Sequence, residues 1–297
     1  MKHPILVLIA GLLLAGCGDS TDPAYVTEVD TWHAGRIERL KSDTGWLTLV
    51  GLHPIAPGLN SAGSDPSAMI RMSDKAPQWL GDFTVEDGLI GFAPHEGVEV
   101  FPFGADGAAP LGARPLKTDR DGAPTVLTTG SLVFHVIDRD GRLFLRVKDR
   151  TSEVLTQFQG IDRFPVQDRW RVTATLEPGP GHVEIPNVLG QSSQSESPGV
   201  LVFKLGRKTH RLIPTGDVQQ GLFLVFGDDT NAVTTYAGGR FLSTGPVGAD
   251  GHVVLDFNQA VNPPCVFTPY ATCPLPPRDN LLAVEISAGE KMWGEPH

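Results

Sequence analysis

The apolar positions near the start of the chain recur at helical spacing between residues 24 and 41. These positions are Val26, Val29, Trp32, Ile37 and Leu40. Thr21 or Asp22 can cap such a helix, and Pro23 suits its first position because no backbone donor is needed there. Gly35 weakens the helix by about 1 kcal/mol relative to alanine. The pattern predicts one N-terminal helix over residues 24–41.

Beyond residue 45 the period of the pattern changes to two, which is typical of strands that bury one face. Alternating segments on either side of a turn predict four hairpins: 83–85 with 89–92, 132–137 with 142–147, 200–205 with 209–213, and 222–226 with 233–236. Further strands are expected at 46–52, 253–257 and 282–286. Many short strands at this spacing predict a mostly β fold of antiparallel sandwich or barrel-like sheets, with the one N-terminal helix.

Composition supports this fold class and adds a division into two units. The chain of 297 residues has 34 glycines and 25 prolines, which indicates many turns and excludes a helical bundle or coiled coil. A net charge of −10 argues against a nucleic-acid partner, which would require a basic stripe. The Gly-rich stretch at 104–116 predicts a boundary between an N-terminal helix and β unit (23–103) and a C-terminal β unit (116–297).

The first residues read as a lipoprotein signal. Lys2 precedes an apolar run over residues 5–15, which is too short to span a bilayer but fits the core of a signal peptide. The run ends in Leu-Ala-Gly-Cys17, which resembles a bacterial lipobox and implies cleavage before Cys17, followed by acylation of that cysteine. We therefore expect a signal peptide (1–16), a lipidated tether (17–22) and a membrane anchor at Cys17.

Residue 18 adds an expectation about location. Because Gly18 rather than Asp follows the cysteine, the resemblance implies the outer membrane, facing the periplasm. An ordinary signal peptide with a chance cysteine is the alternative.

Two cysteines remain after Cys17. In an oxidising compartment Cys265 and Cys273 are expected to form a disulfide, which would contribute about 2.5 kcal/mol in the chain-entropy model. Free thiols and a metal site are the alternatives. A metal site lacks a second cysteine pair or a nearby histidine, so no metal and no cofactor are predicted.

No catalytic motif is present, and candidate chemistry concentrates instead between residues 256 and 280. The chain has no G-x-S-x-G, H-E-x-x-H, P-loop or G-x-G-x-x-G sequence, so no catalytic residue can be assigned. Six prolines stiffen the 256–280 loop, and a stiff loop can hold polar groups ready for a ligand. Its candidate ligand-binding residues are Asp256, Asn258, Asn262, Tyr270 and Asn280.

Two charged residues outside the loop are further candidates. Arg240 follows a pair of glycines, and Glu290 follows the last expected strand, so both can converge on the loop. Three functions remain open: a lipid-anchored protein that binds a small polar ligand or an envelope component at the loop, a hydrolase with Asp256 or Glu290 as general base, and a structural envelope lipoprotein whose loop is a plug. Convergence of the side chains in one cleft would favour the first two, and divergence would favour the third.

Four segments resemble the domain-of-unknown-function family 1684. They are residues 43–52 (DTGWLTLVGL), 160–165 (GIDRFP), 226–242 (FGDDTNAVTTYAGGRFL) and 255–291. The resemblance extends over residues 32–291 and implies a family found in bacteria and archaea, with no established activity. Where members carry Tyr before Asn-Pro-Pro and Arg after the later Asn, this chain has Val261 and Leu281.

Overall fold

A computed structural model describes residues 21–105 and 107–294 of the chain. The expected signal peptide (1–16), Cys17 and residues 18–20 of the expected tether lie outside the described residues. Within the described part, no helix is both long and apolar enough to cross a membrane.

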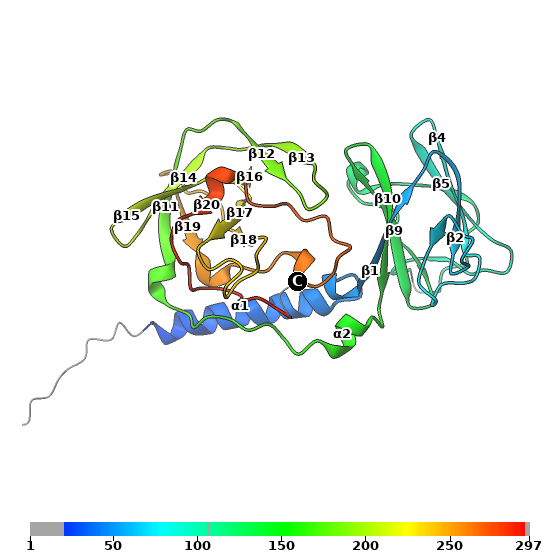
Figure 1. The fold of residues 1–297 in the computed structure, drawn as a ribbon, viewed down its shortest axis with the longest axis horizontal. Helices are drawn as coiled ribbons and strands as arrows, with labels where there is room; N and C mark the ends of the chain where they lie inside the picture. Colours follow the sequence, from blue (N-terminus) through cyan, green and yellow to red (C-terminus); the bar gives the residue numbers. More distant parts are fainter. Residues whose placement is uncertain (1–20, 106, 295–297) are drawn as a thin grey trace, which may run out of the picture.

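The predicted N-terminal helix is present as α1 (Pro23–Lys41), and it begins as the sequence predicts. The Asp22 side chain accepts a hydrogen bond from the Ala24 amide at 2.9 Å, and Pro23 occupies the first turn. The buried face of α1 combines apolar and polar side chains at spacings of three to four residues, among them Val29 and Leu40. The helix runs along the C-terminal half of the chain, as Figure 1 shows.

Ten strands form a first unit, which we define as residues 46–150. They are β1 (Leu49–Ile55), β2 (Gly58–Gly63), β3 (Ile70–Arg71), β4 (Gly81–Glu86), β5 (Leu89–Pro94), β6 (Phe101–Pro102), β7 (Arg114–Leu116), β8 (Leu127–Thr129), β9 (Leu132–Arg139) and β10 (Arg142–Asp149). One sheet has the order β1-β10-β9-β8-β6 and the other β3-β2-β4-β5-β7. Both contribute to one core, in which Phe83, Phe92 and Phe134 pack together.

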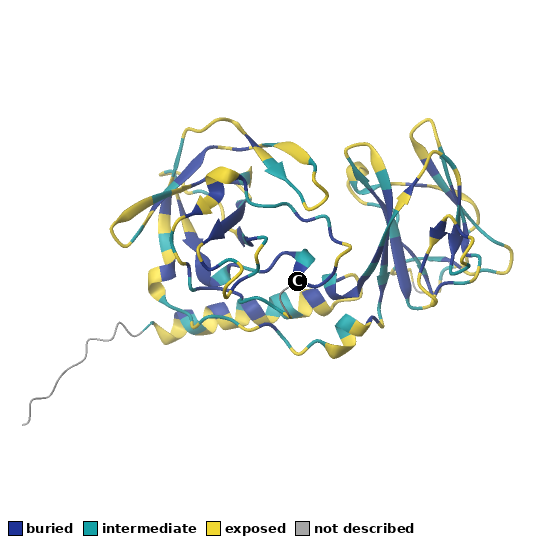
Figure 2. Ribbon diagram, in the orientation of Figure 1, coloured by how far each residue is buried: buried dark blue, intermediate teal, exposed yellow. Residues whose placement is uncertain are grey.

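Ten further strands form a second unit, residues 156–294. They are β11 (Arg171–Glu177), β12 (His182–Pro186), β13 (Ser192–Glu196), β14 (Val200–Leu205), β15 (Lys208–Leu212), β16 (Thr215–Asp217), β17 (Gly221–Asp228), β18 (Arg240–Ser243), β19 (His252–Asp256) and β20 (Leu281–Leu282). The sheets β15-β14-β11-β19 and β16-β17-β18 enclose a second core, and β12-β13 is a separate pair. Figure 2 shows buried residues inside both units.

The expected fold class is confirmed. The sheets are antiparallel apart from two short parallel pairs, and α1 is the long helix of the described residues, beside the five-residue α2 (Glu153–Gln157). Within residues 21–105 and 107–294 no sheet closes into a barrel. Three predicted hairpins are present as β4-β5, β9-β10 and β14-β15. In the first, Asp87 and Gly88 both have positive φ (49° and 77°), which the tight Asp-Gly turn requires.

The fourth predicted hairpin is wrong in its second strand. β17 pairs with β18, not with residues 233–236. Asn231 donates to Thr235 Oγ1 at 3.1 Å and to the Tyr236 carbonyl at 2.7 Å, so side-chain hydrogen bonds fold residues 231–236 into a closed loop. The predicted strand at 282–286 also shortens to β20, which joins β17 in parallel.

The boundary predicted at 104–116 lies inside the first unit. β6 before this stretch pairs with β8 after it, and β5 pairs with β7, so the stretch connects strands of one sandwich. The change of unit comes after β10 instead, across α2. α1 also packs against the second unit, although it precedes the first in sequence. A Gly- and Pro-rich connection marks a turn but does not reveal which strands pair across it.

The two units contact each other around a short 3₁₀ helix, η1 (Trp46–Thr48). Thr268 Oγ1 of the second unit donates to the Leu49 carbonyl of the first at 2.9 Å. Ser152 Oγ, in the segment that joins the units, donates to the Leu47 carbonyl at 2.6 Å. Trp46 packs with Leu49 of the first unit and with Ala271 of the second. Trp46 therefore lies at the junction of the two units.

Candidate functional site

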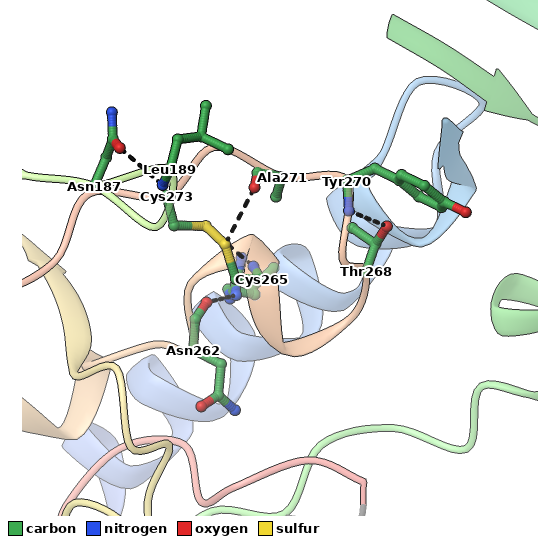
Figure 3. The surroundings of a disulfide bond; sticks show 9 residues. Asn187, Leu189, Asn262, Cys265, Thr268, Tyr270, Ala271 and Cys273 are labelled. Atoms are coloured by element: carbon green, nitrogen blue, oxygen red, sulfur yellow. Dashed lines mark hydrogen bonds between the residues drawn. A yellow bond between two sulfur atoms is a disulfide. The ribbon is translucent and has the colours of Figure 1, made fainter. Parts of the chain in front are cut away.

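The loop of residues 256–280 runs from β19 to β20 and is fixed at several points. Cys265 and Cys273 form the predicted disulfide, with Cα atoms 6.1 Å apart, which leaves neither thiol for a metal (Figure 3). Beyond the disulfide, the Cys273 carbonyl accepts from the Val188 amide at 3.1 Å, and the Leu275 amide donates to the Pro186 carbonyl at 2.7 Å. The loop is thus attached to the end of β12 and to the segment that follows it.

Asp256 and Asn258 hold the start of α1. Asp256 Oδ1 accepts from the Tyr25 hydroxyl at 2.7 Å and from the Asn258 amide at 3.1 Å. The Asn258 side chain binds the backbone of Gln167 through both its oxygen and its nitrogen. Burial and the hydrogen bond to Asp256 raise the pKa of Tyr25 well above its usual range, so the hydroxyl stays protonated as a donor. These two candidates serve the contact between α1 and the second unit.

Glu290 and Asn262 form a second group of polar contacts with α1. Glu290 is fully buried, and its carboxylate accepts from Arg36 Nε at 2.9 Å and from the Asn262 amide at 2.6 Å. His33 Nε2 lies 3.5 Å from the same carboxylate. Burial opposes ionisation, but the contacts of His33, Arg36 and the Asn262 amide outweigh it and hold the pKa of Glu290 below its usual value.

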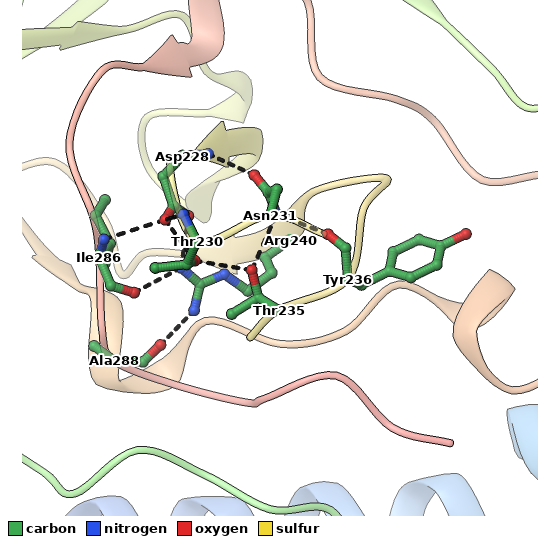
Figure 4. Close-up of polar contacts among 8 residues, drawn as sticks. All are labelled: Asp228, Thr230, Asn231, Thr235, Tyr236, Arg240, Ile286 and Ala288. Atoms are coloured by element: carbon green, nitrogen blue, oxygen red, sulfur yellow. Dashed lines mark hydrogen bonds and ion pairs between the residues drawn. The ribbon is translucent and has the colours of Figure 1, made fainter. Parts of the chain in front are cut away.

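Arg240 is fully buried in the core of the second unit and pairs with Asp228. Its Nη2 donates to Asp228 Oδ2 at 2.7 Å and to the Ile286 carbonyl at 2.9 Å, and its Nη1 donates to the Ala288 carbonyl (Figure 4). The other oxygen of Asp228 accepts from Thr230 and from the Ile286 amide. The ion pair therefore attaches the C-terminal segment to β17 and β18.

The remaining candidates, Asn280 and Tyr270, lie away from these groups of contacts. Asn280 is buried and binds the Ile213 amide at 2.7 Å and the carbonyls of Ile213 and Val225. Tyr270 is 38% exposed, and its ring points away from the disulfide (Figure 3). The seven candidate residues therefore do not meet in one cleft: Asp256 with Asn258, Asn262 with Glu290, Arg240, Asn280 and Tyr270 lie in separate environments.

The two carboxylates proposed as general bases are enclosed. The Glu290 side chain is 1% exposed and is already neutralised by Arg36. Asp256 is 8% exposed, and one of its oxygens accepts three hydrogen bonds. A general base must reach a substrate proton within hydrogen-bond distance, and neither side chain is placed to do so in this arrangement.

Two grooves flank the Pro-rich end of the loop. The first, of about 500 Å³, lies between Pro276 and Leu281 on one side and Asp229, Asn231 and Gly239 on the other. The second, of about 430 Å³, lies between residues 276–279 and the β12-β13 pair. A Cβ on Gly239 would lie 2.5 Å from Pro276 Cγ, and Gly239 has a φ of +83°, so glycine permits this close contact. Residues 275–279 thus form a ridge between two grooves.

A comparison with protein families identifies the family that the second unit matches. The model of a family described as a protein of unknown function (DUF1684) matches residues 156–291. These residues are a DUF1684 domain. The DUF1684 domain contains β11–β20 and the loop of residues 256–280, whereas α1 and the first unit lie outside the match. The resemblance expected from residue 32 onward is therefore shown for the second unit.

Other comparisons add no activity to the DUF1684 domain. No curated protein matches the chain. A solution NMR structure of an uncharacterized protein of Haloarcula marismortui is 28% identical, covers 47% of this chain and 80% of that chain, and has a TM-score of 0.39.

The hydropathy pattern of α1 did not identify three polar residues of the helix that contact the DUF1684 domain. Tyr25, His33 and Arg36 are on the face of the helix that also carries Val29 and Leu40, at spacings of three and four. The helical periodicity of polar residues among the apolar ones was a signal that could have found them. Two enclosed carboxylates of the DUF1684 domain, Asp256 and Glu290, are bound by this helix.

Proposed function

We propose that the protein is a lipid-anchored cell-envelope protein that binds a small polar ligand along the ridge of residues 275–279. The observation that carries the proposal is the ridge itself, which borders two grooves and is stiffened by Pro276 and Pro277. A rigid site loses little conformational entropy when a ligand binds, so more of the interaction energy of its polar groups contributes to affinity. The proposed anchor at Cys17 rests on the lipobox-like sequence before it.

The first groove has the chemistry of a small polar-ligand site. Pro276, Leu281 and Leu282 supply apolar surface, Asp229 is an exposed carboxylate, and Asn231 adds a polar side chain to the lining. An apolar surface with a few placed polar groups is typical of sites that bind small molecules. A neutral or cationic ligand with several hydroxyl or amino groups fits these groups best.

The test is ligand-observed NMR with mixtures of neutral monosaccharides and amino acids. Leu281→Arg would fill the first groove, because Leu281 is 59% exposed at its edge. Leu89→Arg is the matched control, since Leu89 is 75% exposed on β5 of the first unit. We expect transfer signals with the unmodified protein and with Leu89→Arg, and their loss with Leu281→Arg. Equal signals for all three proteins would count against the groove.

The anchor is tested separately by labelling cells with a palmitate analogue. We expect labelled protein in the membrane fraction, and loss of the label after Cys17→Ser. The double variant Cys265→Ala, Cys273→Ala removes the other two cysteines and should keep the label. Retained label in Cys17→Ser would overturn the anchoring proposal.

A structural role is the second candidate, and a specific observation favours it. Asp256, Asn262, Arg240, Asn280 and Glu290 all bind backbone or other side chains that connect segments far apart in the sequence. In this role the loop stabilises the second unit and the grooves remain unused. No comparable observation favours a hydrolase, because both proposed bases are enclosed.

A further inference from the structure

A cluster of cations lies on the first unit, on the face of β10 turned away from that unit's core. Leu145 and Val147 of β10 point into the core, so the alternating residues Arg146 and Lys148 point to the opposite face. Arg146 is directly paired with His135 of β9. Arg146 is nevertheless only 8% exposed, which places a permanent charge in a largely dry position.

The charges in this cluster are not balanced by the described residues. Arg146 Nε and His135 Nδ1 are buried without a hydrogen-bond partner among residues 21–105 and 107–294. Asp119 is the carboxylate whose charge acts on Arg146, but its oxygens already accept from Arg139 at 2.6 Å and from the Asp138 amide at 2.9 Å. Buried polar groups are normally paired, and a buried cation without a partner costs stability.

Burial and mutual repulsion both act against the positive charges. Burial, followed by the charge of Arg139, lowers the pKa of Arg146 to about 10. Burial and the charge of Arg146 lower the pKa of Lys148 to about 8, and the same two causes lower that of His135 to about 4. An anion placed among these three groups would favour their charged forms and raise the pKa of each.

The cluster lies beside the junction of the two units. The guanidinium carbon of Arg146 is 5.4 Å and Lys148 Nζ 5.7 Å from the centre of the Trp46 ring, which packs at that junction. Lys148 is paired with Leu49, whose carbonyl accepts from Thr268 in the loop that also carries the exposed Tyr270. The Trp46 ring thus lies against both cations at the junction.

We propose that Arg146, Lys148 and His135 bind the phosphate group of a small soluble ligand at the junction of the two units. The planar guanidinium can donate two parallel hydrogen bonds to an oxyanion, and the lysine adds a second charge. The unpaired His135 Nδ1 can donate to or accept from the same group, depending on its protonation state. The site is in the first unit and is independent of the grooves proposed in the second.

The experiment compares thermal unfolding in 20 mM inorganic phosphate and in sodium chloride of equal ionic strength. With millimolar affinity, phosphate should raise the Tm of the unmodified protein by roughly 4 °C beyond its general salt effect. Arg146→Met should lose this specific rise, and it should have an equal or higher Tm in chloride because an unpaired buried charge is removed. Arg142→Met, an exposed position on the same strand, should behave as the unmodified protein.

Phosphate also strengthens folding by exclusion from protein surfaces, which would raise all variants equally. An equal rise in Arg146→Met, Arg142→Met and the unmodified protein would therefore overturn the proposal. Lys148→Met is the second variant if Arg146→Met does not fold, and it should reduce the specific rise. Broadening of the ³¹P resonance of phosphate by the unmodified protein, but not by Arg146→Met or Lys148→Met, would support the site, and no broadening by the unmodified protein would refute it.

Discussion

Replacing Glu290 with glutamine should destabilise the protein strongly although the side chain keeps its size. The carboxylate offers two oxygens, which accept from Arg36 Nε at 2.9 Å and from the Asn262 amide at 2.6 Å. Glutamine has one acceptor oxygen and one NH₂ group, so one of these two donors would face another donor. The variant also leaves Arg36 without its ion pair.

The expected loss follows from the burial of the two partners. Removing one member of a buried ion pair typically costs about 3–5 kcal/mol. The Arg36 side chain is 15% exposed and can regain some hydration, so we expect a loss near the lower limit, about 3 kcal/mol. Glu28→Gln is the matched control on α1: its pair with Arg171 is 3.6 Å apart and half exposed, so its loss should be about 0–1 kcal/mol.

The assay is urea unfolding followed by far-ultraviolet circular dichroism and by tryptophan fluorescence, with Arg36→Met and the double variant completing a mutant cycle. We expect Glu290→Gln to lower the urea midpoint, and the double variant to be less destabilised than the sum of the single variants, because no buried charge is left alone. A loss below about 1 kcal/mol for Glu290→Gln, or one equal to that of Glu28→Gln, would refute the view that this buried pair secures α1.

Three further predictions concern acid, the disulfide and Arg240. Because the folded-state pKa of Glu290 lies below its usual 4.5, its stabilisation is complete above about pH 4.5 and is lost as the pH falls through the folded value; urea midpoints from pH 6 to pH 3 should fall in the unmodified protein and less in Glu290→Gln. Reducing Cys265–Cys273 should cost about 2.5 kcal/mol, measured by urea unfolding with and without a phosphine reductant, and no change would show that the folded loop does not need the bond. Arg240→Met should cost about 3–5 kcal/mol, against less than about 1 kcal/mol for the exposed Arg211→Met, and equal losses would contradict a stabilising role of the buried pair.

Local signals predicted much of the secondary structure. Asp22 and Pro23 start α1 because capping and the fixed φ of proline act within one turn of the chain. Asp87-Gly88 forms its hairpin because both positions must adopt positive φ. The disulfide followed from the expected oxidising compartment and from the even number of cysteines that remain after Cys17.

The sequence predicted less well which distant strands pair with each other. The segment 233–236 has strand-like hydropathy, yet Asn231 closes it into a loop, and β17 selects β18 instead. Likewise, residues 104–116 have the composition of a linker but connect strands of one sandwich. Hydropathy identifies a strand but not its partner, because several partners bury the same apolar face equally well.

The candidate site shows the same limit for side chains. The loop of residues 256–280 could be recognised as rigid and polar from its prolines, cysteines, asparagines and aspartates. The partners of its polar groups could not, since Tyr25 reaches Asp256 across 231 residues and Arg36 reaches Glu290 across 254. A polar residue type shows that a hydrogen bond is needed, and only the packed chain shows whether backbone, a helix or a ligand provides it.

The amino-acid sequence by itself therefore determined the mostly β class, the start of α1, three hairpins and the disulfide, all of which depend on local conformational preference or on covalent chemistry. Only the tertiary structure decided where the two units divide, that α1 belongs with the second, and that Asp256, Asn258, Asn262 and Asn280 of the loop are buried. It also placed Arg146 in a buried position, where its Nε has no hydrogen-bond partner among residues 21–105 and 107–294. These outcomes depend on which distant surfaces exclude water from each other, and no short stretch of the chain contains that information.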